Sequence, residues 1–140
     1  MSSGDYRKPL PAIDVDNAPF WESCRRHALA LQRCAACGTF RYPPRPLCPA
    51  CHAAETEWVP VSGRGRVYVS LVMYRAPTPA WEQDTPYNVS AIELDEGVRL
   101  WSNVVGCLPE AVRVGDDVTI DYDDVTDEVT LPRFRRVQDL

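Results

Sequence analysis

CAACGTFRYPPRPLCPAC (residues 34–51) holds four cysteines as two Cys-x-x-Cys pairs, Cys34/Cys37 and Cys48/Cys51, separated by ten residues. Each pair can wrap a tight turn around one metal ion, and the intervening loop lets the second pair complete a tetrahedron. A redox dithiol needs only one such pair, so the pattern favours a tetrathiolate metal site. Four protein ligands leave no open position for water or substrate. We therefore expect a structural metal, with Zn²⁺ as the first choice and iron as the second.

The residues that follow each pair support this interpretation. Gly38 comes directly after the first pair and suits the positive φ that such a turn often needs. His52 occupies the matching place after the second pair, and histidine tolerates left-handed geometry better than most residues. We therefore expect the four cysteines, and not His52, to be the ligands. Arg33, Arg41 and Arg45 are candidates to neutralise the negative charge of the site, and ordinary solvated arginines are the alternative.

Length, composition and charge are those of a soluble globular protein. The 140 residues, 45% hydrophobic and 25% charged, fit one domain or a small module joined to a larger one. A net charge of -5 argues against a protein that mainly coats nucleic acid. No apolar run is long enough to span a bilayer, and MSSGDYRKPLP (1–11) lacks the apolar core of a signal peptide. We predict no membrane association and a cytoplasmic location, where thiols stay reduced and disulfides are unusual.

The stretch before the cysteines, DNAPFWESCRRHALALQRC (16–34), has the pattern of an amphipathic helix. Capping residues come first, and a proline falls in the first turn. Apolar residues then recur at helical spacing, namely Phe20, Cys24, Ala28 and Leu31. We expect one helix over about residues 18–31, within a segment 17–33 that precedes the cysteines. Phe20 and Trp21 are candidates for docking a partner protein, and packing on the rest of the same chain is the alternative.

After the cysteines the pattern alternates with the period of a strand. The five predicted strands are GRVYVSLVMYR (65–75), YNVSAIEL (87–94), VRLWSNVV (98–105), VRVGDDVTIDY (112–122) and EVTLPRF (128–134). In the first of them we expect one face to hold Val67, Val69, Leu71 and Met73. Five strands with little helix between them favour a small OB-fold barrel. The expected protein is mainly β, with an N-terminal extension (1–16), an amphipathic helix (17–33), a rubredoxin-like four-cysteine zinc ribbon (34–57) and a five-stranded OB-fold barrel (58–140).

Helix, ribbon and barrel in this order resemble the bacterial and archaeal zinc-ribbon/OB-fold proteins associated with acyl-CoA metabolism. The resemblance is carried by PFWESCRRHALALQRCAACG (19–38), YPPRPLCPAC (42–51), VSGRGRVY (61–68), AIELDEGVRLWSNVVG (91–106) and LPRFRRV (131–137). His52 departs from the family pattern, which usually has glycine there. The resemblance implies a non-catalytic partner of thiolase-like enzymes, including steroid side-chain aldolases, thiolases and acyltransferases, or of acyl-CoA hydratases. Such partners bridge enzyme subunits and help to form the passage for the CoA thioester.

A proline-rich loop, YRAPTPAWEQDTP (74–86), carries Trp81 near its tip. Loops of this length in a compact barrel are often functional, so Trp81 could line an acyl passage or anchor a partner. The alternative is that it folds back over the barrel. Arginine forks suit phosphate groups, and the candidates for contacts with CoA are Arg64, Arg66, Arg75, Arg133, Arg135 and Arg136. For each of them, ordinary surface charge is the alternative.

Catalysis by the chain itself is not indicated. A nucleophilic cysteine needs a histidine base and a group that orients the histidine. His27 lies three residues after Cys24, but the sequence shows no orienting group, and Cys107 has no nearby histidine. We therefore predict no catalytic residue.

The rival hypothesis is single-stranded nucleic-acid binding, because zinc ribbons and OB barrels both serve it. The bases could stack on Tyr68, Tyr74 and Trp101, next to the basic run RFRR (133–136). The acidic net charge and the acidic segment at 116–124 count against this hypothesis.

Overall fold

The computed structural model describes residues 6–140, so the first five residues of the expected extension lie outside it. The elements are α1 (Ala18–Arg25), β1 (Ala30–Cys34), β2 (Phe40–Arg41), β3 (Thr56–Pro60), β4 (Arg64–Met73), β5 (Tyr87–Leu94), β6 (Arg99–Ser102), β7 (Val104–Val105), β8 (Asp117–Asp124) and β9 (Thr130–Arg136). Short 3₁₀ helices occupy Pro79–Asp84, Pro109–Ala111 and Val137–Asp139. The expectation of a mainly β protein with an N-terminal helix is confirmed. Within residues 6–140, every helix is too short or too polar to cross a membrane.

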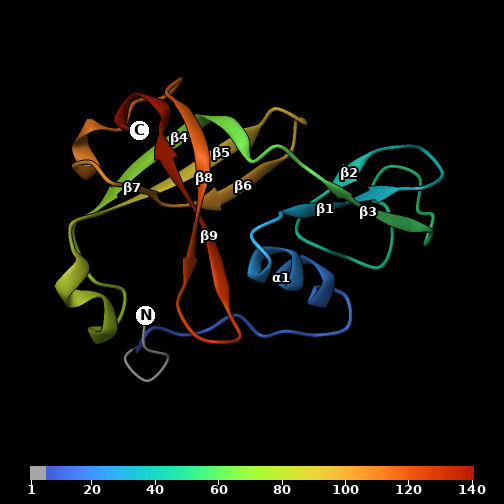
Figure 1. Cartoon of the computed structure of the whole chain (residues 1–140), viewed down its shortest axis with the longest axis horizontal. Helices are drawn as coiled ribbons and strands as arrows, with labels where there is room; N and C mark the ends of the chain where they lie inside the picture. The colour runs from blue at the N-terminus through green and yellow to red at the C-terminus, as the bar shows by residue number, and fades with distance from the viewer. Residues whose placement is uncertain (1–5) are drawn as a thin grey trace.

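The strands form two sheets at opposite ends of the molecule (Figure 1). The smaller sheet has the order β2-β1-β3 and is antiparallel throughout. It carries the four-cysteine loops, so it is the ribbon. The larger sheet has the order β6-β5-β4-β8-β9-β7.

The larger sheet is OB-like without being a fully closed barrel, and it has six strands where the sequence predicted five. The predicted strand 98–105 is divided at Asn103 into β6, which pairs with β5, and β7, which runs parallel to β9. Asn103 is held at this division because its Nδ2 donates to the carbonyl oxygen of Asn88 and its own carbonyl accepts from Phe134 N. Both edges of the sheet therefore come from one short segment of chain.

A β-bulge in β4 separates Val67 from Val69, Leu71 and Met73, which the sequence predicted on one face. Before the bulge, Val67 pairs with Ile92 and is buried at 2% exposure. The register shifts between Val67 and Val69, and beyond it Leu71 is 48% exposed. An extra residue in one strand turns the following side chains to the other face. The expectation that Val67, Val69, Leu71 and Met73 share one face is therefore wrong, because the last three lie on the face opposite to Val67.

The helix is shorter than the sequence predicted. It ends at Arg25, and the chain reverses at His27, whose φ is +57°. Ser23 fixes the reversal, because its buried Oγ donates to Phe20 O and accepts from Ala30 N. Leu29 therefore lies in the connection after the helix, and Leu31 lies in strand β1. In the sequence both residues fit a helix as well as a strand, and the tertiary contact of Ser23 decides against the helix.

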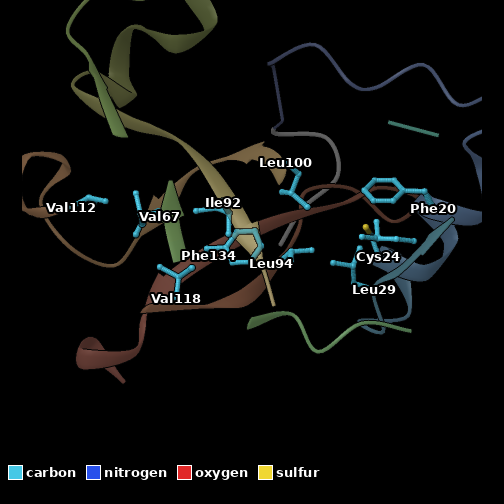
Figure 2. Packing of buried hydrophobic residues seen from close by; sticks show 12 residues of the cluster. Phe20, Cys24, Leu29, Val67, Ile92, Leu94, Leu100, Val112, Val118 and Phe134 are labelled. Atoms are coloured by element: carbon cyan, nitrogen blue, oxygen red, sulfur yellow. The ribbon is translucent and has the colours of Figure 1, made fainter. Parts of the chain in front are cut away.

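One hydrophobic core joins the helix to the larger sheet. Figure 2 shows Phe20, Cys24 and Leu29 continuing the cluster that contains Leu94 and Leu100. Helix α1 contacts both β9 and β1. The helix therefore packs on the same chain, which was the alternative to a docking helix.

Candidate metal centre and adjoining pockets

The four cysteines converge as the sequence predicted. The Sγ atoms of Cys34, Cys37, Cys48 and Cys51 all lie within 4.8 Å of one another. Cys34 Sγ lies 3.5 Å from Cys51 Sγ, and Cys37 Sγ lies 3.7 Å from Cys48 Sγ. A tetrahedral ion with bonds of about 2.3 Å needs sulfur atoms about 3.8 Å apart. The site therefore fits a metal ion with four thiolate ligands, and it matches a closed structural centre.

The two Cys-x-x-Cys turns have the same geometry. The amide of Gly38 donates to Cys34 O at 2.8 Å, and the amide of His52 donates to Cys48 O at 2.9 Å. Both residues have positive φ, +79° for Gly38 and +67° for His52. The expectation for these two positions is confirmed. Amides also point at sulfur, since Cys37 N lies 3.5 Å from Cys34 Sγ.

Without a metal, the crowded thiols hold their protons unequally. Hydrogen bonding with Thr39 lowers the pKa of Cys37 to about 6. The amide of Ala53 favours the thiolate of Cys51, but the neighbouring cysteine sulfurs outweigh it and raise the pKa of Cys51 to about 12. A bound divalent cation holds such groups as thiolates and displaces their protons. Metal binding at this centre therefore releases protons.

The three arginines near the ribbon differ in their surroundings. Arg33 Nη2 lies 2.5 Å from Glu57 Oε1, so its charge is already paired. Arg41 is buried, and its Nε donates to Gln32 Oε1. Arg45 is exposed, and its backbone amide donates to the same Gln32 oxygen. Their role as neutralising neighbours of a metal centre stays a prediction.

The two candidate docking residues lie at the junction of helix and ribbon. Phe20 is 1% exposed, and its ring centroid lies 4.9 Å from that of Trp21 and 5.4 Å from that of Tyr42. Trp21 is half-buried against the core. Of the two candidates, only Trp21 keeps surface that a partner could contact, since Phe20 is enclosed by the chain itself.

Two of the candidate passage residues meet at one pocket, which has a volume of about 490 Å³. Trp81 and Arg133 both line it, together with Lys8, Tyr87 and Cys107. The Trp81 ring stacks on Tyr87 with centroids 4.6 Å apart, and Lys8 Nζ lies 4.9 Å from the Trp81 ring. The loop thus folds back and still presents its tryptophan to a pocket.

The other candidate arginines lie elsewhere. Arg64, Arg66 and Arg75 are exposed on β4 and the loop that follows it. Arg135 Nη2 is paired with Asp121 at 2.8 Å. These four residues do not line the pocket at Trp81.

Two domain families match consecutive parts of the chain. The model of the ChsH2 rubredoxin-like zinc ribbon domain matches residues 21–57, and that of the ChsH2 C-terminal OB-fold domain matches residues 58–123. A DUF35 domain-containing scaffold protein of Methanothermobacter thermautotrophicus is 33% identical over 105 residues, which cover 74% of this chain and 78% of that protein. The chain belongs to the ChsH2 (DUF35) family. The resemblance found in the sequence is confirmed.

Two further similar proteins are named as parts of enzymes. The "Probable enoyl-CoA hydratase alpha subunit" of Thermomonospora curvata is 43% identical over 128 residues, 91% of this chain, and the chain spans 40% of its length. A solved structure, "Ltp2-ChsH2(DUF35) aldolase", superposes with a TM-score of 0.82 at 42% identity and covers 91% of this chain and 98% of that one.

In this ChsH2-family chain, His27 is oriented by a carboxylate that the sequence did not reveal. His27 Nε2 lies 2.8 Å from Asp124 Oδ1, and its ring stacks on Tyr122 with centroids 4.6 Å apart. Cys24 itself is 0% exposed, and burial raises its pKa to about 12. It is therefore a core residue, as predicted. No local signal could have found Asp124, which is 97 residues away along the chain.

The aromatic residues of the nucleic-acid hypothesis are exposed, but the basic run that was expected beside them is paired with acidic side chains. Tyr68, Tyr74 and Trp101 are 46%, 68% and 59% exposed. In the basic run at 133–136, each arginine is paired with an aspartate, namely Arg133 with Asp123, Arg135 with Asp121 and Arg136 with Asp139. These ion pairs neutralise the charge that a nucleic-acid groove would need.

Proposed function

We propose that this chain is a non-catalytic accessory subunit of an enzyme that acts on acyl-CoA thioesters, either a thiolase-like enzyme or a hydratase. The observation that carries the proposal is the superposition on the Ltp2-ChsH2(DUF35) aldolase, which extends over nearly the whole of both chains. The hydratase alpha subunit of Thermomonospora curvata points to the same kind of chemistry. Steroid side-chain degradation is one setting that the resemblance implies.

In this proposal the ribbon holds Zn²⁺ and serves folding. Four thiolates at tetrahedral spacing close the coordination sphere and leave the ion no substrate position. Helix α1, which packs on both the ribbon and the larger sheet, then offers Trp21 as an aromatic contact to the partner.

The pocket at Trp81 is proposed to form part of the passage for the CoA thioester. Its lining combines aromatic rings, which suit an apolar acyl chain, with Lys8 and Arg133, which could meet an anionic end. Each of these cations is paired with an aspartate of the same lining, Lys8 with Asp84 and Arg133 with Asp123. Arg133 is 15% exposed and already pairs with Asp123, so Lys8 and Arg133 would orient the ligand while aromatic contact supplies affinity.

The first test is a tagged pull-down from the native cell's lysate, with mass spectrometry of co-eluting proteins and absorbance at 260 nm. The expected result is a stoichiometric acyl-CoA enzyme that is lost with Cys34→Ser and kept with His52→Gly. His52→Gly is the matched control, because glycine adopts the observed positive φ without strain. Nucleic acid that elutes at high salt, with no such enzyme, would instead establish the nucleic-acid hypothesis.

The passage is tested in the recovered complex. Trp81→Ala should raise KM for the acyl-CoA about tenfold, because base–aromatic or acyl–aromatic contact is worth about 1–3 kcal/mol. Trp101→Ala, an exposed tryptophan on β6 away from the pocket, is the control and should leave KM unchanged. Equal KM values for Trp81→Ala and Trp101→Ala would contradict a passage at Trp81. They would not affect the proposed role as an accessory subunit.

A further inference from the structure

A second cavity, of about 600 Å³, lies between the ribbon and the turn that joins β5 to β6. Its ribbon wall includes Gly38, Arg41 and Arg45, and its sheet wall includes Glu96 and Arg99. It shares no residue with the pocket at Trp81. A ligand held here would contact both sheets of the molecule.

Arg41 is the most unusual residue of this cavity. It is 3% exposed, and its Nε donates to Gln32 Oε1 at 3.2 Å. Its Nη1 and Nη2 atoms are buried, and nothing among residues 6–140 accepts their hydrogen bonds. A buried guanidinium with unpaired donors is costly, because it has lost water and gained no acceptor.

Glu96, on the opposite wall, has an acceptor oxygen without a hydrogen-bond donor. Its Oε2 accepts from Ser62 N at 2.9 Å, whereas its Oε1 is buried and lacks a donor within the described chain. Arg41 and Glu96 are not among the ion pairs closer than 4.0 Å between residues 6 and 140. Both residues therefore line the same cavity and hold unpaired polar atoms, which neighbouring atoms cover until a side chain rotates.

The charge of the lining favours an anion. Arg45 is exposed at the cavity. Arg99 also lines the cavity, but its guanidinium is paired with Glu93 and lies 3.7 Å from the Tyr68 ring centroid. Arg41 and Arg45 therefore supply the positive charge, and Glu96 is the one carboxylate of the lining. Phosphate matches several guanidinium forks at once, and side-chain rotations on binding are common.

We propose that this cavity binds a phosphate ester whose organic part carries a hydroxyl or amino donor, such as a nucleotide. The phosphate oxygens accept from Arg41 and Arg45, and the donor of the organic part satisfies Glu96. The site is independent of the proposed accessory role, since it requires no partner protein. One bound ligand would then pair the unpaired groups of both Arg41 and Glu96.

The test is isothermal titration calorimetry of the metal-loaded full chain with AMP, CoA and inorganic phosphate. AMP or CoA should bind at least about tenfold more tightly than inorganic phosphate, because only the esters also engage Glu96. A preference for one of the two esters identifies the source of the phosphate. No binding of either ester, or equal affinity for inorganic phosphate, would overturn the proposal.

Variants separate this site from simple surface charge. Arg45→Ala should weaken AMP binding about tenfold, and Glu96→Gln should abolish the preference for esters over inorganic phosphate. Arg26→Ala, an exposed arginine outside the cavity, is the matched control and should bind as the natural chain does. Arg41→Lys tests the buried guanidinium of Arg41, because lysine cannot donate two parallel hydrogen bonds to one phosphate. If that variant fails to fold, the Arg45 and Glu96 variants still test the proposal. Unchanged binding in both Arg45→Ala and Glu96→Gln would contradict it.

Discussion

The ribbon and the larger sheet are stabilised by different means. Between residues 35 and 57, the only fully buried residues are Arg41 and Cys48. The larger sheet, in contrast, buries a continuous cluster that includes Val67, Ile92 and Phe134. A loop region with so little apolar burial needs a cross-link, and four thiolates around one ion supply it. We therefore expect a structural metal to take the place of a hydrophobic core in the ribbon.

The strongest test of this difference is loss of the metal. Structural zinc is worth about 10–16 kcal/mol in zinc-finger peptides, so Cys34→Ser should unfold the ribbon and leave the larger sheet folded. Hydrogen exchange should show fast amides in β2 and β3 and protected amides in β5. Cys107→Ser, which removes a thiol outside the cluster, should keep the full metal content. Full metal content and a protected ribbon in Cys34→Ser would contradict the comparison.

The converse test removes part of the hydrophobic core. Phe134 is 0% exposed, and Phe134→Ala should lower the free energy of unfolding by about 3–5 kcal/mol because it leaves a cavity. Urea denaturation measures the change. The exposed Leu108 is the control, since Leu108→Ala should change stability by less than about 0.5 kcal/mol. Similar losses in the two variants would show that the sheet does not depend on its core.

A smaller effect is expected where the two regions join. Ser23→Ala leaves Ala30 N without its buried acceptor and should cost about 1–3 kcal/mol. Ser62→Ala removes a comparable contact to Arg64 N at an exposed site, where water replaces it. Thermal unfolding should therefore show a lower Tm for Ser23→Ala and an unchanged Tm for Ser62→Ala.

The smallest effect concerns pH. A hydrogen bond with His27 lowers the pKa of Asp124 below its ordinary value of 3.8. A depressed folded-state pKa stabilises the protein above pH 3.8, and that stability is lost as the pH falls through the folded pKa. Both side chains are about half exposed, so the contribution should be below about 1 kcal/mol. In Asp124→Asn, the free energy of unfolding should fall less steeply as the pH is lowered below 3.8. The control Asp127→Asn, at a nearby exposed site, should keep the pH dependence of the natural chain.

The local patterns of the sequence predicted the metal centre and much of the sheet. The strand over residues 87–94 is β5 as predicted, because its alternation and its flanking turn signals are both local. The helix was predicted six residues too long, since Leu29 and Leu31 suit a strand as well as a helix. Trp81 and Arg133 were both candidates, but the sequence could not indicate that they share a pocket.

The sequence by itself determined the four-cysteine centre, because each Cys-x-x-Cys turn with Gly38 or His52 is specified within a few residues. Only the tertiary structure decided the division at Asn103, the orientation of His27 by Asp124 and the burial of Arg41 opposite Glu96. Each of these depends on groups far apart in the chain. Their proximity, and hence their loss of water, arises only when the two sheets and the helix pack together.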